Sequence, residues 1–344
     1  MNDKPLLGLM LGDCTGIGPE QSAKILSSRT TADVARLLVV GDRRVLDMGA
    51  RDAGLRLDIR AVKRPEDADW HSPAVQMIDL ANVDPAAIPR GAISAESGRV
   101  TGETLRFMIE LALEGRLDGI TFAPLNKAAL HAGGWKYNDE HIMFARLTKH
   151  EGYHGEMNVL DNKWMSRATS HVSLREALDQ LTPARIDEAL TLAHETMKGA
   201  GFATPRIAVA ALNPHGGENG LFGREEIEII APAVARGAAR GIACKGPFPA
   251  DTVFIKGFGD EFDGVLTMYH DQGQIATKLK GFNRGVTVSG GLKTVFTTPA
   301  HGTAFDIVGK GVASIGAFEN AIRLGARLAA ARRSQGVAKH ASHA

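Results

Sequence analysis

The sequence has little cysteine, no long apolar run and no leader-like start. Its two cysteines, Cys14 and Cys244, lie far apart and form no Cys-x-x-Cys pair, so neither a disulfide framework nor a thiolate zinc site is expected. No stretch approaches the roughly 20 apolar residues that span a bilayer. Asp13 interrupts the short apolar start, and no small-residue cleavage site follows it. We therefore expect no membrane contact and place the chain in the cytoplasm.

The sequence also lacks a large net charge and the standard nucleotide-binding motifs. The 40 basic and 39 acidic residues nearly cancel, which leaves no overall field to attract nucleic acid. Residues 12–20 are glycine-rich, but they have neither the Gly-x-Gly-x-x-Gly spacing nor the lysine of a P-loop. We interpret this segment as a strand-to-helix turn that lines a cleft.

The chain contains several apolar runs of strand length. At 344 residues it exceeds the usual size of a single core, which favours two lobes. Near-continuous apolar runs, typical of strands buried on both faces of a sheet, begin near residues 6, 36, 118, 206 and 263. Helical spacing over residues 101–113 and in the segment after Gly223 predicts helices between such strands. The pattern predicts an α/β fold.

Three histidines stand at the predicted edges of these elements. His171 precedes a predicted helix, whereas His215 and His270 each follow an apolar run, where parallel sheets present active residues. Three neutral imidazoles with one open position are typical of a catalytic site for Zn²⁺ or a related ion. Because the chain holds 12 histidines, surface or packing roles are the alternative.

Two further segments carry candidate chemistry. Residues 301–311 are glycine-rich and lead into a predicted helix, whose first amides can hold the phosphate or ribose of a dinucleotide. A packing turn is the alternative there. Asp251 and Lys278 would supply a carboxylate and an amine for proton transfer near a metal. Solvated surface charges are the alternative for both.

Together these segments resemble the 4-hydroxythreonine-4-phosphate dehydrogenase family, the PdxA-like proteins of vitamin B6 synthesis and their catabolic relatives. The resemblance runs from about residue 6 to about residue 328. It rests on six motifs in the family's order: GIGPE at 16, LNPHGGENG at 212, GPFPADT at 246, YHDQG at 269, GF-x-RGV at 281 and HGTA-x-DI-x-GKG at 301.

The resemblance implies two α/β/α lobes, as in isocitrate and isopropylmalate dehydrogenases, with an active-site cleft between the lobes at a dimer interface. Residues 1–127 and 297–344 would form a terminal lobe with the cofactor loop. Residues 128–296 would form a central lobe with the metal ligands and dimer contacts. A homodimer would then be required for activity, because the ligands of one metal would come from two chains.

The resemblance also assigns roles to single residues. A divalent metal, expected to be zinc, would be held by His171, His215 and His270. Asp251, Asp271 and Lys278 match catalytic positions, with Lys278 the first candidate for substrate contact and proton transfer. The NAD or NADP cofactor would be bound by Gly290, His301, Gly302, Thr303, Asp306 and Gly309.

The sequence departs from the family where the B6 enzymes bind substrate. Their Gly-His-Thr-Glu signature is replaced by residues 138–141, which include Glu140 and His141. A gapless match puts Thr287 and Phe296 where those enzymes grip the substrate with Asn and Arg, so a guanidinium is lost. We therefore expect Glu140, His141, Lys278, Thr287 and Phe296 to bind a different hydroxy acid.

The favoured reaction is NAD(P)-linked oxidation and decarboxylation of a cis-dihydrodiol dicarboxylate of the terephthalate type. The metal would lower the pKa of the substrate hydroxyl and then polarise the ketone so that CO₂ can leave. One alternative is the 4-hydroxythreonine-4-phosphate dehydrogenase reaction itself, or oxidation of a phosphorylated four-carbon sugar acid. A non-catalytic dimeric binding protein is the alternative from another class.

Overall fold

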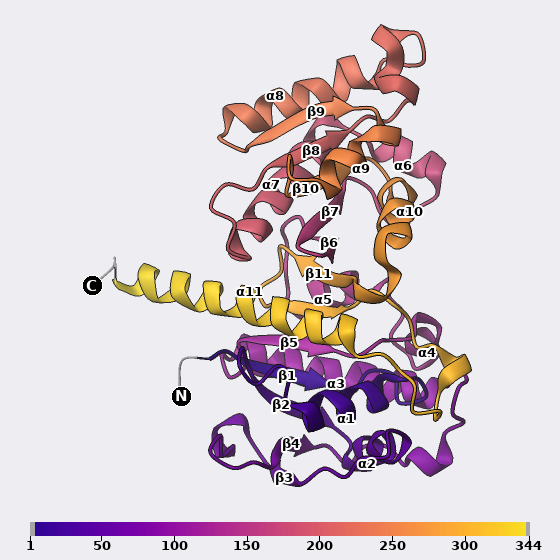
Figure 1. The fold of residues 1–344 in the computed structure, drawn as a ribbon, viewed down its shortest axis with the longest axis vertical. Coiled ribbons are helices and arrows are strands. Elements are labelled where there is room, and N and C mark those ends of the chain that lie inside the picture. The colour runs from indigo at the N-terminus through magenta and orange to yellow at the C-terminus, as the bar shows by residue number, and fades with distance from the viewer. Residues whose placement is uncertain (1–3, 342–344) are drawn as a thin grey trace. The chain divides into compact units, whose positions relative to one another are not determined.

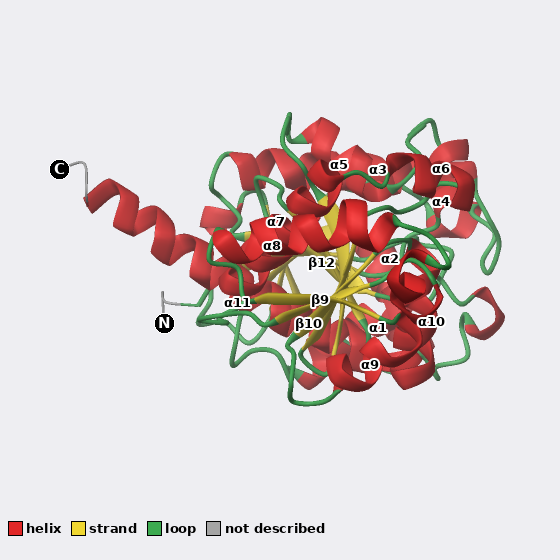
Figure 2. Ribbon diagram, turned by 90° about the horizontal axis from the view of Figure 1, so that it is seen from above, coloured by secondary structure: helices red, strands yellow, loops and turns green. Residues whose placement is uncertain are grey.

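The computed structural model describes residues 4–341, which form two compact units. The first unit contains the residues up to His150 together with those from Leu292 onward, and the second contains Glu151–Gly291. Strands form the centre of each unit and helices surround them (Figures 1 and 2). The predicted α/β fold class is confirmed. No helix within residues 4–341 has the length and apolar character needed to cross a bilayer.

The first unit is built on a parallel sheet with the strand order β3-β4-β2-β1-β5-β12. Its strands are β1 (Leu6–Met10), β2 (Arg36–Gly41), β3 (Ile59–Val62), β4 (Val75–Asp79), β5 (Gly119–Phe122) and β12 (Phe296–Pro299). Its helices are α1 (Gly18–Ser28), α2 (Arg43–Asp52), α3 (Ala95–Leu113), α4 (Lys127–Ala132), α5 (Glu140–Leu147) and α11 (Gly316–Ala341), with short 3₁₀ turns at Pro65–Asp67, Pro85–Ala87 and Phe305–Ile307. β1 and β5 are buried along their whole length, as expected for strands covered by helices on both faces.

The second unit has a mixed sheet with the strand order β11-β6-β7-β10-β8-β9. Its strands are β6 (Gly155–Leu160), β7 (Lys163–Arg167), β8 (Ile207–Ala210), β9 (Cys244–Phe248), β10 (Gly264–Thr267) and β11 (Val286–Gly290). β6 pairs antiparallel with both β7 and β11, while β7, β10, β8 and β9 run parallel. The helices are α6 (Leu174–Gln180), α7 (Pro183–Gly199), α8 (Ala231–Ala239), α9 (Ala250–Phe258) and α10 (His270–Gly281), with short turns at Pro214–Gly220, Glu226–Ile230 and Phe282–Arg284.

The elements predicted from the apolar pattern are present. The five predicted strands coincide with β1, β2, β5, β8 and β10, and residues 101–113 lie within α3. The segment after Gly223 forms a π-helical turn at Glu226–Ile230 that continues into α8. Pro232 lies in the first turn of α8, where its missing N–H is tolerated.

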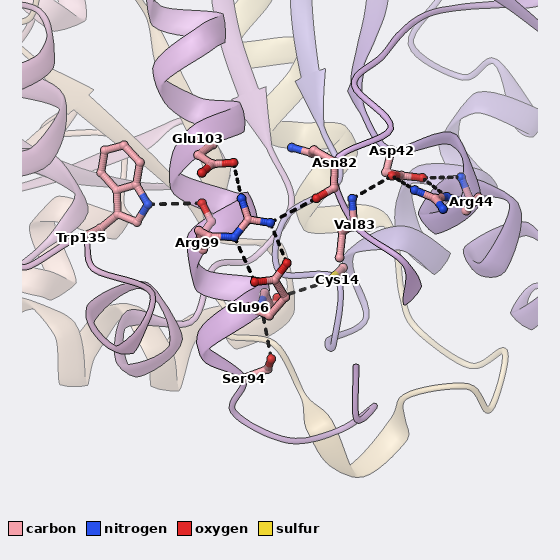
Figure 3. Close-up of polar contacts among 11 residues, drawn as sticks. Cys14, Asp42, Arg44, Asn82, Val83, Ser94, Glu96, Arg99, Glu103 and Trp135 are labelled. Carbon is pink, nitrogen blue, oxygen red and sulfur yellow. Dashed lines mark hydrogen bonds and ion pairs between the residues drawn. The ribbon is translucent and has the colours of Figure 1, made fainter. Parts of the chain in front are cut away.

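The boundary between the units differs from the expected one. Residues 128–150 and 292–296 belong to the first unit, not to a central lobe that begins at residue 128. Trp135 explains part of this placement, since its indole Nε1 donates to the backbone oxygen of Arg99 on α3 at 3.2 Å (Figure 3). Phe144 on α5 adds to it by packing against Phe122 and Phe296 in the core of the first unit.

Candidate active site

Two of the three candidate metal-binding histidines lie next to each other in the second unit. His171 follows β7, and His270 begins α10 shortly after β10. Because β7 and β10 are neighbouring parallel strands, their carboxyl ends meet at one edge of the sheet. The ring centroids of His171 and His270 are 5.4 Å apart. His171 also has a left-handed backbone, with φ 50°, which is uncommon outside glycine and concentrates at functional sites.

The surroundings of His270 favour a neutral imidazole. Its Nδ1 lies 2.7 Å from Oδ1 of Asp271, a contact that orients the ring and directs Nε2 away from the carboxylate. Burial lowers the pKa of His270, the hydrogen bond to the carboxylate of Asp271 opposes this effect, and the positive charge of Arg167 adds to the lowering. The net pKa lies below its usual value. The neutral form is the one that binds a divalent metal.

A buried polar network lies beside His171. Oε2 of Glu156 is 3.7 Å from Nε2 of His171, and Oε1 of Glu156 is 2.9 Å from Nη2 of Arg167. The same guanidinium nitrogen donates to Oδ1 of Asn158 at 2.6 Å. Sequence reasoning missed Glu156 and Arg167. The available signal was a charged residue at the end of a strand, since Arg167 terminates β7 four residues before His171.

A cavity of about 180 Å³ adjoins the histidine pair. Two segments line it, with the residues Thr169, Ser170, His171, Val172, Leu174, Ala177, Tyr269, His270 and Asp271. The lining includes two imidazoles, and imidazole nitrogens are ligands that Zn²⁺ and related divalent cations accept. Whole small-molecule sites usually exceed about 300 Å³, so this cavity is smaller than a complete substrate site.

The third candidate, His215, stands apart from this pair. It begins a run of six residues with positive φ, His215–Gly220, and its side chain is 67% exposed. Glu226 anchors the turn, because its Oε1 accepts hydrogen bonds from the backbone amides of Leu212 and Asn213. Within residues 4–341 of one chain, no group of three or more His, Cys, Asp or Glu side chains could hold a metal. One chain therefore brings together His171 and His270 but not His215.

The predicted catalytic side chains lie on two helices of the second unit. Asp271 and Lys278 are both exposed on α10, and they are separated by two helical turns, so they face the same side of that helix. Asp251 is exposed in the first turn of α9. Asp271 is the one that the structure connects directly to the histidine pair, through its contact with His270.

The predicted substrate residues Glu140 and His141 begin α5 in the first unit. Asp139 caps this helix by accepting a hydrogen bond from the amide of Ile142 at 2.8 Å. Oε2 of Glu140 lies 3.3 Å from Nζ of Lys127. His141 is 5% exposed. The carboxylate of Asp139 therefore serves as a helix cap, and that of Glu140 is one half of an ion pair.

Thr287 and Phe296, the other two predicted substrate contacts, are both engaged in packing. Oγ1 of Thr287 accepts a hydrogen bond from Nδ2 of Asn158 at 3.0 Å, and the residue is 7% exposed. Phe296 is 1% exposed and lies in the apolar core of the first unit. A direct substrate contact by Phe296 is contradicted by this burial.

Five of the six predicted cofactor residues, His301, Gly302, Thr303, Asp306 and Gly309, form one segment of the first unit. The backbone oxygen of Thr303 accepts a hydrogen bond from the amide of Ile17 at 3.1 Å. A Cβ atom at Gly16 would lie 2.8 Å from Cβ of Thr303, so glycine allows this close approach. A Cβ atom at Gly302 would meet open space, which leaves the backbone there accessible to a ligand.

The sixth predicted cofactor residue, Gly290, lies in the second unit at the end of β11. A Cβ atom at this position would lie 2.4 Å from Cε of Met157 and 2.9 Å from Oγ1 of Thr196. The packing of β11 against β6 and α7 therefore accounts for a glycine at this position without any ligand.

Comparisons with known proteins agree on one family. Residues 33–325 match the family described as pyridoxal phosphate biosynthetic protein PdxA. The chain is 45% identical to a Pseudomonas aeruginosa protein provisionally named 4-hydroxythreonine-4-phosphate dehydrogenase 2, over 94% of this chain and 97% of that protein. It is 40% identical to the D-threonate 4-phosphate dehydrogenase of Cupriavidus necator, over 95% of this chain and 98% of that protein.

Solved structures give the same grouping. A 4-hydroxythreonine-4-phosphate dehydrogenase from Burkholderia phymatum superposes with a TM-score of 0.80 at 38% identity, covering 95% of this chain and 99% of that one. A terephthalate 1,2-cis-dihydrodiol dehydrogenase from Burkholderia xenovorans gives 0.65 at 27% identity, covering 94% and 98%. The similarity is thus greater to the phosphate-ester dehydrogenases than to the dihydrodiol enzyme that the sequence analysis favoured. The chain belongs to the PdxA family.

Proposed function

We propose that this chain is a metal-dependent, NAD(P)-linked dehydrogenase that oxidises a hydroxyl group of a small phosphorylated hydroxy acid, such as D-threonate 4-phosphate or 4-hydroxythreonine-4-phosphate. The observation that carries the proposal is the His171–His270 pair, with its rings 5.4 Å apart beside a cavity of about 180 Å³. The names of the relatives point to these substrates, and they favour the alternative of the sequence analysis over its terephthalate-type substrate.

His171 and His270 would supply two ligands of a divalent metal. His270 offers a neutral ring oriented by Asp271, and His171 lies beside the carboxylate of Glu156. A divalent ion held here would lower the pKa of the substrate hydroxyl and polarise the product ketone. The buried Arg167 neutralises Glu156 and so limits the negative charge behind the imidazoles. Zinc is the ion that we propose, since imidazole nitrogens are among its preferred ligands.

Lys278 and Asp271 are the proposed groups for substrate contact and proton transfer. Both are exposed on the same side of α10, the helix that His270 begins. The ammonium group of Lys278 would attract a phosphate or carboxylate as a point charge. Where the oxidised carbon is β to a carboxylate, the resulting β-keto acid would lose CO₂ once its ketone is polarised.

The dinucleotide would be bound by the segment from His301 to Gly309 in the first unit. This segment fits a dinucleotide because Gly302 leaves its backbone uncovered and because Ala304 and Gly309 have positive φ. Exposed backbone amides in such turns are suitable partners for phosphate and ribose oxygens. We no longer assign Gly290 to this site, because packing accounts for it.

A homodimer with shared sites is part of the proposal. One chain supplies His171 and His270 together, so the partner chain would supply His215. The exposed left-handed turn that carries His215 is suited to reach into another molecule. α10 also exposes Ile275 at 60% and Leu279 at 85%, apolar surface of the kind that a partner covers.

The test is turnover by the purified, zinc-supplemented protein with NAD⁺ or NADP⁺, followed by reduced-cofactor absorbance. D-threonate 4-phosphate, 4-hydroxythreonine-4-phosphate, unphosphorylated D-threonate and the terephthalate cis-dihydrodiol are compared side by side. We expect turnover of a phosphorylated substrate only. His270→Ala should lower kcat/KM by about 10³-fold, and His131→Ala, at an exposed position on α4, should change it less than about twofold. Turnover of the dihydrodiol alone would refute the proposed substrate class.

A further inference from the structure

The first turns of α1 are hydrogen-bonded to residues 311–314, which follow the proposed cofactor segment His301–Gly309. Oε1 of Glu20 accepts a hydrogen bond from the amide of Ala313 at 2.8 Å. Nζ of Lys24 donates to the backbone oxygens of Gly311 and Ala313, each at 2.9 Å. Glu20 and Lys24 are themselves paired at 2.7 Å, one helical turn apart. The pair therefore binds both the N–H and the C=O of Ala313.

Gln21 makes a second connection between the same two segments. Its Nε2 donates to the backbone oxygen of Ser314 at 2.6 Å and lies 3.3 Å from Nε2 of His301. Gln21 is fully buried, and the side chain of Glu20 is 2% exposed. Four hydrogen bonds thus join α1 to Gly311, Ala313 and Ser314, and Gln21 also contacts His301 at the start of the cofactor segment.

The segment depends on such contacts because its own backbone is permissive. Gly309 and Gly311 have φ values of 76° and 71°, in the region where glycine is free and other residues are strained. A chain with two such glycines close together has many conformations of similar energy. The geometry of residues 309–314 must therefore be selected by further contacts, and the hydrogen bonds from Glu20, Gln21 and Lys24 are among them.

We propose that Glu20, Gln21 and Lys24 are positioning residues that hold residues 301–314 in the conformation that receives the dinucleotide. The inference rests on the proposed function, in which this segment binds NAD(P). Residues 301–314 are then ordered before the dinucleotide binds, so the entropy lost in ordering them does not reduce the affinity for the cofactor. This also gives a role to Glu20 of the GIGPE motif, whose segment the sequence analysis interpreted as a strand-to-helix turn.

The test compares Lys24→Met with Lys163→Met. Lys163 is a matched control in the second unit, since its Nζ also donates to two backbone oxygens, those of Gly259 and Phe262. Amide hydrogen exchange of residues 309–314 is measured in the cofactor-free protein, and the Kd for NAD⁺ and NADP⁺ is measured by calorimetry. We expect exchange in this segment to rise at least about tenfold, and cofactor Kd to rise about tenfold, in Lys24→Met only.

Conservative variants separate positioning from general destabilisation. Lys24→Arg keeps a cation near Glu20 and should restore most of the cofactor affinity, while the KM for the hydroxy acid and the Tm should stay close to wild type. Equal loss of cofactor affinity in Lys24→Met and Lys163→Met, or unchanged exchange at 309–314 in Lys24→Met, would overturn the inference. If the wild-type chain bound neither dinucleotide, the proposed function would fail, and the exchange data would still show whether α1 orders the segment.

Discussion

The ring of Phe296 lies parallel to the ring of Phe144, with centroids 4.2 Å apart and planes 6° apart. Phe122 meets Phe144 edge-on at 5.6 Å. These three rings come from β12, α5 and β5, so they tie α5 to the sheet of the first unit. With 1% of its surface exposed, Phe296 has no free face for a ligand. A gapless sequence match identifies which residue occupies a family position, but it does not show which way the side chain points.

Truncating Phe296 should therefore affect stability before it affects the substrate. We expect Phe296→Ala to lower the free energy of unfolding by about 3–5 kcal/mol, because it leaves a cavity beside Phe144. Phe296→Leu should lower it by about 1–2 kcal/mol. Urea unfolding measures both. In Phe296→Leu the KM for the hydroxy acid should equal that of wild type, and a several-fold rise in KM at full stability would restore Phe296 as a substrate contact.

At the scale of elements, the buried parallel strands were predictable and the β6–β7 hairpin was not. β8 and β10 are continuous apolar runs, whereas β6 carries Glu156 and Asn158 within it. Those two polar side chains are satisfied by Arg167 on the neighbouring strand, a pairing that appears only when the strands are side by side. The residue types of the turn were a local signal. Asp161 and Asn162 both have positive φ, as a two-residue hairpin turn requires, and Asp and Asn tolerate that conformation.

Asp42 shows how one capping side chain can connect two elements. Its Oδ1 accepts a hydrogen bond from the amide of Arg44 in the first turn of α2, and its Oδ2 accepts one from the amide of Val83 (Figure 3). Asp42 is 3% exposed. Asp42→Ala should lower the free energy of unfolding by about 2 kcal/mol, since α2 loses its cap and a buried amide loses its acceptor. The matched control is Asp84→Ala, an exposed cap of a short 3₁₀ turn, which should cost a few tenths of a kcal/mol.

Because the Asp42 carboxyl titrates, the loss of unfolding free energy in Asp42→Ala should depend on pH. Burial acts to raise the pKa of Asp42, but the hydrogen bonds from Arg44 and Val83 outweigh it and hold the pKa below its usual value. A carboxyl whose folded-state pKa is depressed stabilises the fold above its unfolded pKa of about 3.9, and this contribution is lost as the pH falls through the folded-state pKa. The difference between wild type and Asp42→Ala should thus be constant from pH 7 to pH 5 and shrink below about pH 4. A deficit that persisted unchanged at low pH would contradict this account.

At the scale of the whole molecule, the three candidate histidines show where sequence reasoning ends. His171 and His270 meet because they follow neighbouring strands, and strand order is a property of the fold that spacing along the chain does not reveal. His215 follows β8, the strand on the other side of β10, and its turn is left-handed and exposed. Local sequence identifies all three candidates, but their grouping depends on the fold and, in the proposed homodimer, on the partner chain.

A shared site makes a specific prediction for mixed chains. His215→Ala and His270→Ala should each be inactive alone, because every site of either homodimer lacks one ligand. In a heterodimer, one site combines the intact His171 and His270 of the first variant with the intact His215 of the second, while the other site carries both changes. Random exchange of subunits at equal concentrations yields heterodimers as half of all dimers, so about a quarter of wild-type activity should return.

The control for this experiment is a mixture of His171→Ala and His270→Ala. These two residues lie in the same chain with rings 5.4 Å apart, so every site of their heterodimer lacks one of them, and no activity should return. Subunit exchange is followed with differently tagged chains, so that a failure to mix is not mistaken for a failure to complement. Recovery in the first mixture but not in the second would assign His215 to the partner chain. No recovery in either, with exchange demonstrated, would mean that all three histidines act within one chain or that His215 is not a ligand.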